Sequence, residues 1–455
     1  MQRDSSVPIS VLVYYGIGIC GLWLIWQALL FFLVNFYIPP TGDGLPIFIY
    51  QGKIFLFVNA IAIISFVTRL FDFITDPIIG NLIDKHKGKK GGRFSFLKIG
   101  SLSALLFVLI FLPIHNYPSP INAAWLLFTL TIFYLVFTCY FIPYFTLMVD
   151  ISKSNGDRVN FATSVGVAIS LSLVMSAQVP LLWELFQSHG FTVLQSRQLG
   201  FVVLGVIAFV MMLVPIFTLP DTSNLSKNAA VLNLKDAMKY ISKNRYFRPY
   251  FICVLFYYIA NAIFVAGVPY LITVLLDLNA TQIAKVAPII FLSSISVYPL
   301  INVLAKTIGK KLLFFIAMIM YSIGFAAASY LGKYSASSLM QAYTIAAYFG
   351  VAAGIMSIIL SAMCADIAEH SKKCLGVVSE AAFFAGKNMA LKLGAVIGVS
   401  TFAAFTLLGK DVGHDLGLRA INMLSSAICF IGAMLVLTLY SEKKLFQELQ
   451  HAGGS

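Results

Sequence analysis

Charged residues are scarce in this sequence. Only 11% of the 455 residues are Asp, Glu, Lys or Arg, whereas 60% are hydrophobic. Soluble domains carry about 25% charged residues, so this chain has too little polar surface for a water-soluble fold. The composition therefore excludes a cytosolic enzyme, a secreted domain and a disordered scaffold.

Metal-binding and catalytic patterns are also missing. The six cysteines are scattered, with no CxxC and no paired spacing, which is typical of small apolar residues in helix interfaces. The stretch from Asp366 to His370 lacks the second histidine that a helical zinc motif requires. No nucleophile stands beside a base. We therefore expect neither an enzyme nor a protein with a resident cofactor.

Long apolar runs are what the chain has in abundance. A helix needs about 20 apolar residues to cross a bilayer, and the runs bounded by charges, Pro or Gly predict twelve spans. The spans are 9–37, 54–82, 96–115, 121–149, 158–183, 197–219, 247–276, 282–305, 311–331, 337–364, 379–408 and 418–441. The expected fold class is an all-α, multi-pass membrane protein.

The twelve spans form two sets of six. We expect six-helix bundles over 1–219 and 247–445, a cytoplasmic amphipathic linker over 220–246 and a cytoplasmic tail over 446–455. The first span is too long for a cleavable signal. The net charge of +13 comes mainly from Lys and Arg in expected inner segments, which indicates topology rather than nucleic-acid binding. Both termini are then cytoplasmic.

A short basic turn recurs at the same place in each half. Gly80 and Asp84 precede a run of basic residues that ends at Arg93, and residues 302–311 form a similar turn. Two pseudo-symmetric six-helix bundles around a cavity are the major facilitator architecture. The first turn matches that superfamily's Gly-x-x-x-Asp-basic-x-Gly pattern. We expect Gly80, Asp84 and Arg93 to form a conformational loop; a solvated anchoring cluster is the alternative.

Three charges lie inside the second expected span. Each costs about 2.5–3.5 kcal/mol at bilayer depth. Arg69, Asp72 and Asp76 stand at i, i+3 and i+7, which places them on one helix face. Two carboxylates one turn apart repel unless a proton or cation lies between them. Arg69 can compensate one, and Thr75 and Thr138 could add oxygen ligands. The alternative is a structural salt-bridge network.

A second group of charges lies in the span 379–408. Glu380, Lys387 and Lys392 fall on one broad face of the predicted helix. With Glu380 inside the membrane, three acids would balance three bases, as a closed polar cavity requires. Glu380 could instead lie at the inner mouth and pair with a basic loop residue.

Four blocks of the sequence resemble the glycoside–pentoside–hexuronide:cation symporters, the melibiose-carrier-like branch of the major facilitator superfamily. The blocks are Arg69 to Gly80 continuing into Gly92-Arg93, Ile142-Pro143-Tyr144, Asn244 to Phe247, and Ala365-Asp366 followed by Glu380 and Lys392-Leu393-Gly394. The resemblance implies that Asp72, Asp76, Thr75 and Thr138 bind Na⁺, Li⁺ or H⁺. It also implies that Lys392 lies close to the cation and the substrate.

The chain departs from this family where sugars are recognised. Sugar-recognising members have acids where this chain has Trp23 and Phe141, a tryptophan at Phe145 and an arginine at Gly166. These changes make a polar pocket apolar and aromatic. We expect Trp23, Phe141, Phe145 and Lys387 to line a pocket for an amphipathic or anionic solute. Sodium-dependent lysophospholipid carriers of the same branch also lack the sugar acids, so a lipid-like substrate is an alternative.

These features together predict a secondary active symporter. A cation, Na⁺ or H⁺, would drive a small organic solute across the membrane by alternating access. The alternative is a non-coupled facilitator or a transporter-like sensor whose charges are structural. We expect a monomer that contacts membrane lipids in a bacterial inner membrane, with no nucleic-acid partner.

Overall fold

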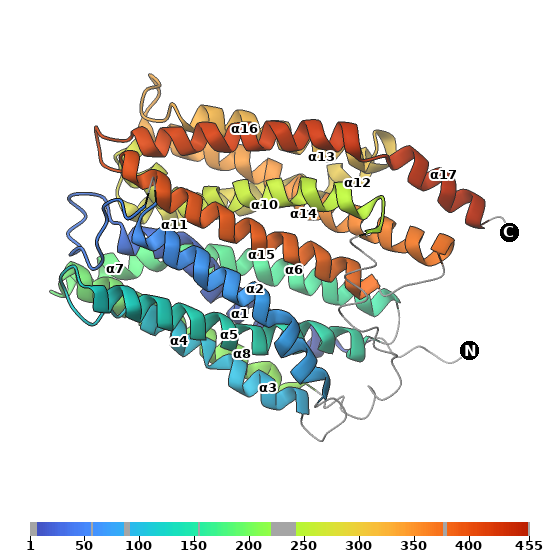
Figure 1. Ribbon diagram of the computed structural model, residues 1–455, viewed down its shortest axis with the longest axis horizontal. Coiled ribbons are helices and arrows are strands. Elements are labelled where there is room, and N and C mark those ends of the chain that lie inside the picture. Colours follow the sequence, from blue (N-terminus) through green and yellow to red (C-terminus); the bar gives the residue numbers. More distant parts are fainter. Residues whose placement is uncertain are drawn as a thin grey trace. The chain divides into compact units, whose positions relative to one another are not determined.

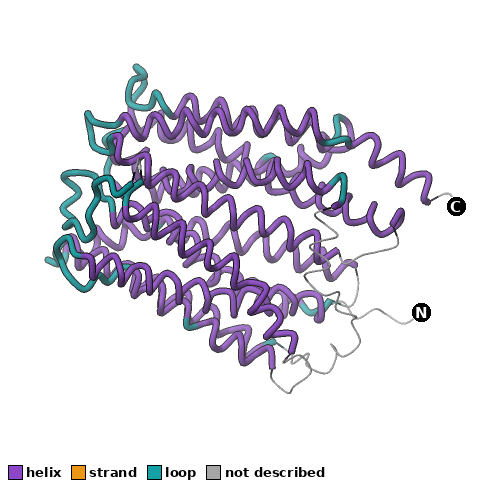
Figure 2. Tube along the Cα trace, viewed as in Figure 1, coloured by secondary structure: helices purple, strands orange, loops and turns teal. Residues whose placement is uncertain are grey.

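The computed structural model describes residues 7–55, 58–85, 92–152, 155–219, 243–375 and 380–453. Within these ranges the regular elements are helices, and the β-structure is limited to two isolated bridges, Phe55–Val58 and Asp411–His414 (Figure 2). The chain divides into two compact units, Met1–Ala230 and Val231–Ser455. The predicted linker falls mostly on residues 220–242, which lie outside the described ranges.

The first unit is built around α1 (Ile9–Tyr37), most of which is buried. α1 packs against α6 and α8, while α2 packs against α5 (Figure 1). α6 and α7 together make one apolar span, interrupted near Pro180, which has no N–H to donate to a helical carbonyl. The remaining helices are α2 (Ala60–Lys85), α3 (Gly92–Ser101), α4 (Ser103–Ile110), α5 (Pro120–Ile151), α6 (Asn155–Ala177), α7 (Val179–Ser188) and α8 (Val193–Thr218).

The second unit repeats this plan with its own helices. α10 continues into a π-helical turn, Leu271–Leu275, directly after Pro269. α11 and α12 together make one apolar span, and a proline again stands at the start of the second piece. The helices are α10 (Phe247–Tyr270), α11 (Ile283–Ser296), α12 (Tyr298–Thr307), α13 (Lys310–Ala328), α14 (Ser338–Leu375), α15 (Glu380–Phe405), α16 (Leu416–Leu439) and α17 (Glu442–Gly453).

The two units share the same internal helix pairings. In the first unit, α1 packs against α6 and α8, α2 against α5, and α3 and α4 against α5 and α8. In the second unit, α10 packs against α15 and α16, α11 against α14, and α13 against α14 and α16. Each first span therefore contacts the fifth and sixth, and each second span the fourth. This equivalence agrees with the predicted pseudo-symmetric repeat.

Ten helices among the described residues are long and apolar enough to cross a membrane. The two other predicted spans fall short for different reasons. The helix α2 is long enough to cross a membrane, but any 18 consecutive residues of it include three charged residues, Arg69, Asp72 and Asp76. The third predicted span is divided into α3 and α4 and gives a shorter apolar helix, Phe94–Ile110. The helix α2, with three charged residues near its middle, is thus the one that carries the predicted cation site.

The start of α2 corrects the predicted boundary at residue 54. The helix begins at Ala60, because Asn59 Oδ1 accepts the N–H of Ala62 at 2.9 Å and so caps the first turn. The apolar residues before Asn59 include Phe55, which forms a bridge with Val58. Apolar composition alone does not show where a helix starts.

Most of the segment expected as a tail is the helix α17, which packs against α14. Leu445 is fully buried. The Glu442 carboxylate accepts the backbone N–H groups of Lys310 and Lys311 at the start of α13, each at 2.9 Å. Glu448 bonds to His370 Nε2 at 2.7 Å and also accepts from Arg245. These contacts attach α17 to the rest of the second unit.

Candidate functional site

The two acids of α2 meet one hydroxyl of α5. Thr138 Oγ1 lies 3.0 Å from Asp72 Oδ1 and 3.0 Å from Asp76 Oδ1. Asp72 and Thr138 are buried, at 3% and 0% exposure, and Asp76 is partly buried. The helical spacing of four residues directs both carboxylates to the same neighbour, because α2 packs against α5 along this face. Three of the four residues predicted to bind the cation therefore lie together.

The number of hydrogens available determines which of these contacts can be hydrogen bonds. A threonine hydroxyl has one hydrogen, so Thr138 can donate to only one of the two carboxylates at a time. The two Oδ1 atoms lie within about 6 Å of each other, since each is 3.0 Å from the same oxygen. The second contact becomes favourable if a carboxyl proton points to Thr138. A small cation held by the three oxygens satisfies them as well.

The fourth predicted ligand, Thr75, lies one turn after Asp72 and is 8% exposed. Its Oγ1 donates to the backbone carbonyl of Asp72 at 3.1 Å. Such bonds from a hydroxyl to a preceding turn are common inside helices. The lone pairs of Thr75 remain available, so its role as a cation ligand stays a prediction.

Arg69 is held by aromatic rings. Its guanidinium carbon lies 4.9 Å from the ring centroid of Trp26 and 5.1 Å from that of Tyr134. Arg69 is only 3% exposed, and its Nε and Nη2 have no hydrogen-bond partner within the described ranges. Cation–π attraction is stronger in a desolvated setting, about 2 kcal/mol or more. Compensation of a carboxylate by Arg69 would therefore act through space, and it stays a prediction.

The aromatic residues predicted to line a pocket belong to a longer row in the first unit. Trp23 lies edge-on to Trp26, with ring centroids 6.3 Å apart. Trp26 stacks on Phe137 at 5.4 Å, and Phe137 stacks on Phe141 at 6.0 Å. Phe141 in turn contacts Phe145 at 4.8 Å. The row therefore runs from α1 along α5 and connects the three predicted aromatics.

Sequence reasoning missed Trp26, Tyr134 and Phe137. Their spacing did carry a signal: Trp26 stands three residues after Trp23, and positions 134, 137, 141 and 145 share one helix face. Thr138 lies next to these aromatic residues on the same side of α5. Aromatic residues are so frequent in this chain that the spacing becomes informative only once α5 is known to pack against α2.

The predicted residues of α15 lie in the second unit. Lys387 Nζ donates to Ser361 Oγ on α14 at 3.2 Å and lies 5.2 Å from the centroid of the Phe384 ring. Lys392 is buried, at 7% exposure. Glu380 is the first residue of α15, and its side chain lies outside the described part of the structure. The structure brings Lys387 close to α14, which the sequence did not indicate.

The predicted conformational loop is described only in part. Gly80 lies in α2, where a Cβ would come no closer than 4.0 Å to Ile142 of α5. Asp84 and Arg93 belong to α2 and α3, but their side chains and residues 86–91 lie outside the described part of the chain. The role of these three residues stays a prediction.

A transition-metal site finds no support in the described residues, which contain no group of three His, Cys, Asp or Glu arranged around one point. The cluster on α2 and α5 has two carboxylates and a hydroxyl, which are hard oxygen donors. Such donors suit a proton or an alkali cation better than a transition metal. This donor set is therefore compatible with reversible binding of a proton or an alkali cation, which stays a prediction.

Comparison with known proteins gives one family and several relatives. The family described as MFS/sugar transport protein matches residues 14–442. The lactose permease of Leuconostoc lactis is 25% identical over 339 residues, which cover 69% of this chain and 50% of that protein. Sodium-dependent lysophosphatidylcholine symporter 1 of Xenopus tropicalis is 25% identical over 139 residues, 28% of this chain and 26% of that protein. The chain thus spans half or less of the length of these relatives.

A solved structure shows the same fold at low sequence identity. The crystal structure of nucleoside transporter NupG superimposes with a TM-score of 0.66 and covers 95% of this chain and 100% of that chain. The two sequences are 12% identical, so the likeness concerns the fold alone.

Proposed function

Because this chain belongs to the MFS/sugar transport protein family, we propose that it is a secondary transporter that couples a cation to the movement of a small organic solute. The coupling ion is Na⁺ or H⁺. The observation that carries this proposal is the contact of Thr138 Oγ1 with the carboxylates of both Asp72 and Asp76. The chain is a multi-pass membrane protein, and transport rather than catalysis is the activity that its family and its site support.

Coupling follows from the position of the three oxygens on two helices. Asp72 and Asp76 belong to α2, and Thr138 belongs to α5. A bound cation or proton would draw these helices together and so favour conformations in which they are close. If the solute binds best to the same conformations, each ligand raises the affinity for the other by the same factor. Alternating access then carries both across the membrane.

The solute is not a simple galactoside. The aromatic row from Trp23 to Phe145 offers stacking and apolar surface, whereas sugars require charged hydrogen-bond acceptors for discrimination. An anionic amphiphile, such as a lysophospholipid-like molecule, fits this surface better. The named activity of the lysophosphatidylcholine symporter among the relatives supports the same class.

The second candidate is a non-coupled facilitator or sensor with purely structural charges. If the charges are purely structural, Arg69 should form ion pairs with its neighbours. The unpartnered Nε and Nη2 of Arg69, within the described ranges, and its position between two rings argue against such a network. An exchangeable cation therefore explains the acids of α2 better than an ion-pair network built on Arg69.

The thermal midpoint of the purified protein against sodium concentration tests the proposal. Choline chloride keeps the ionic strength constant, and Asp76→Asn is the comparison. A ligand that binds only the folded state stabilises it by about 2.7 kcal/mol at one hundred times Kd. We expect a sodium-dependent rise in the wild type that Asp76→Asn lacks. A shift with pH alone, absent from the variant, would assign H⁺ instead. A wild type that responds to neither cation would refute coupling.

Organisation and location complete the proposal. One chain carries both six-helix bundles, so a monomer in contact with lipid suffices for transport. The basic residues of the expected inner loops favour cytoplasmic termini. A bacterial inner membrane fits the short loops.

A further inference from the structure

A histidine near the end of α14 is buried under α17. His370 is 3% exposed, and its Nε2 lies 2.7 Å from Glu448 Oε2 on α17. Its ring also lies edge-on to that of Tyr246, the residue before α10, with ring centroids 4.9 Å apart. These contacts hold the imidazole ring between three segments of the second unit. Neither the predicted cation site nor the predicted pocket uses this residue.

The position of the hydrogen on His370 follows from its partner. The hydrogen bond from Arg245 lowers the pKa of Glu448 below its usual range, so this carboxylate is ionised at neutral pH and can only accept. Nε2 of His370 therefore carries a hydrogen. Nδ1 is buried and has no hydrogen-bond partner within the described ranges. It is thus the atom that gains or loses a proton when the ring changes its charge.

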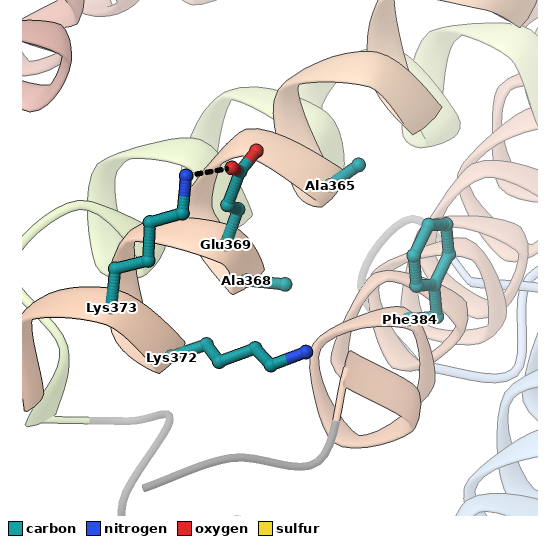
Figure 3. A pocket seen from close by; sticks show the side chains of 6 residues that line it. All are labelled: Ala365, Ala368, Glu369, Lys372, Lys373 and Phe384. Atoms are coloured by element: carbon teal, nitrogen blue, oxygen red, sulfur yellow. Dashed lines mark ion pairs between the residues drawn. The ribbon is translucent and has the colours of Figure 1, made fainter. Parts of the chain in front are cut away.

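The acids of α14 that lie near His370 have cationic partners of their own. Glu369, the preceding residue, forms an ion pair with Lys373 at 2.6 Å beside the cavity between α14 and α15 (Figure 3). Asp366, one turn earlier, accepts a hydrogen bond from Lys310 of α13 at 2.7 Å. These two acids are therefore already neutralised and do not compete with Glu448 for the histidine.

The other elements packed here leave Glu448 as the acid in contact with His370 among the described residues. Glu448 shares its carboxylate with Arg245, which precedes α10. On α17, Glu442 is directed to the backbone N–H groups that begin α13. The remaining charged or titratable residues of α17 and of the start of α10 are exposed to solvent: Lys443, Lys444, His451, Lys243 and Arg248.

The attachment of α17 depends on pH if its docked and released forms bind protons differently. In the docked form, a charged His370 makes an ionic hydrogen bond to Glu448, whereas in the released form it faces water. Ionic hydrogen bonds are about twice as strong as neutral ones, so we expect the carboxylate to outweigh the hydration that the ring regains. Histidine changes its charge between about pH 5 and 8, well above the range in which Glu448 itself accepts a proton. Docking should therefore become tighter as the pH falls from about 8 to about 6.

We propose that His370 is a proton sensor that controls the attachment of α17 to α14 and to the start of α10. Protonation of Nδ1 tightens the attachment, and deprotonation loosens it. Release of α17 also withdraws Glu442 from the first N–H groups of α13, so the effect reaches a further helix. This inference goes beyond the proposed transport function and does not depend on which cation is coupled.

Hydrogen exchange of the α17 amides tests the proposal on the full chain in nanodiscs of a zwitterionic lipid. Rates at about pH 6 and about pH 8 are corrected for the intrinsic pH dependence of exchange, so that they measure the docked fraction. His370→Gln keeps a neutral N–H donor and cannot titrate. Glu448→Gln keeps the histidine and removes its anionic partner. His451→Gln, at the exposed histidine of α17, and Asp76→Asn, in the cation site, are the controls.

We expect the protection of α17 in the wild type to be about fivefold greater at the lower pH, as when a neutral hydrogen bond becomes ionic. The ratio should be near one in His370→Gln and in Glu448→Gln, and unchanged in both controls. Protection of α16 shows that each variant is folded. A wild type without the pH effect, or a His370→Gln variant that retains it, would overturn the proposal. Loss of the effect in His451→Gln or Asp76→Asn would also overturn it, because another group would then be the sensor.

Discussion

Thr138 Oγ1 on α5 lies 3.0 Å from Asp76 Oδ1 on α2, so one side-chain contact joins two helices that are 62 residues apart in the sequence at this point. The same hydroxyl reaches Asp72. If a cation occupies this cluster, as proposed, its binding would be linked to the packing of α2 on α5. A transporter needs such a link, because the bound ion must change the relative stability of its conformations.

Thr138→Val removes the hydroxyl and keeps the branched shape of the side chain. If the hydroxyl contributes about 1.4 kcal/mol to the free energy of sodium binding, its loss would raise the Kd for sodium about tenfold. Thr138→Ser retains the hydroxyl and should stay close to the wild type. A sodium titration of the thermal midpoint measures all three proteins. An unchanged Kd in Thr138→Val would remove this hydroxyl from the cation site.

The ring of Tyr134 is predicted to stabilise Arg69. Tyr134→Leu removes the ring that lies 5.1 Å from the guanidinium carbon and should lower the free energy of unfolding by about 2 kcal/mol or more. Tyr134→Phe keeps the ring and should remain near the wild type. Denaturation in mild detergent compares the two variants. Equal destabilisation of both would mean that the phenol hydroxyl, and not the ring, holds Arg69.

Periodicity and charge predicted most of the fold, and the structure brings together three of the residues predicted for the cation site. The apolar runs predicted the helical spans, because a membrane requires long apolar helices whatever their neighbours. The spacing of Asp72 and Asp76 predicted a shared face, because helical geometry is local. The contact of that face with Thr138 was supplied only by the resemblance to a family, since it depends on packing between distant segments.

The environment of Arg69 could not be predicted in the same way. Sequence reasoning expected that Arg69 can compensate an acid on its own helix, and it did not indicate that Arg69 also lies between Trp26 of α1 and Tyr134 of α5. Three helices determine that environment. α17 was also missed, because its attachment depends on Glu442 and Glu448, whose partners lie 78 to 203 residues earlier in the chain.

Glu442 is predicted to stabilise the start of α13. The residue before this helix is Gly309, which has no side chain to cap it, and Glu442 accepts the N–H groups of Lys310 and Lys311 instead. Glu442→Ala should therefore cost about 1–2 kcal/mol of stability. Glu184→Ala changes an exposed glutamate of α7 and should stay within about 0.5 kcal/mol. Thermal unfolding of both variants tests this; equal midpoints would contradict the capping role.

The attachment of α17 through Glu448 should weaken in acid. The hydrogen bond from Arg245 lowers the pKa of Glu448 below its usual range. A glutamate whose pKa is lowered in the folded state stabilises that state at pH values above its ordinary pKa of about 4.3. This stabilisation disappears as the pH falls through the lowered pKa. Glu448→Gln should therefore unfold at a lower temperature than the wild type at pH 7. The difference should narrow as the pH is lowered toward 3. A difference that is independent of pH would show that the charge of Glu448 contributes nothing.

Two glycines of α15 allow its close approach to α10. A Cβ at Gly394 would lie 2.4 Å from Tyr258 Cβ, and one at Gly398 would lie 2.6 Å from the backbone oxygen of Ile259. These glycines are four residues apart, the spacing by which small residues let membrane helices pack closely. The clash at Gly398 is with backbone, which cannot move aside as a flexible side chain can. Substitution there must separate the helices.

Gly398→Ala should therefore lower the stability by about 1–3 kcal/mol. Gly166→Ala is the matched control, because Gly166 is also inside a helix, α6, but has no atom within 4 Å of an added Cβ. Without a clash, alanine should be neutral or stabilising by up to about 1 kcal/mol. Thermal unfolding of the two variants gives opposite signs if close packing of α15 on α10 holds the second unit together. A loss of stability in both would mean that glycine serves helix flexibility in this protein and not close packing.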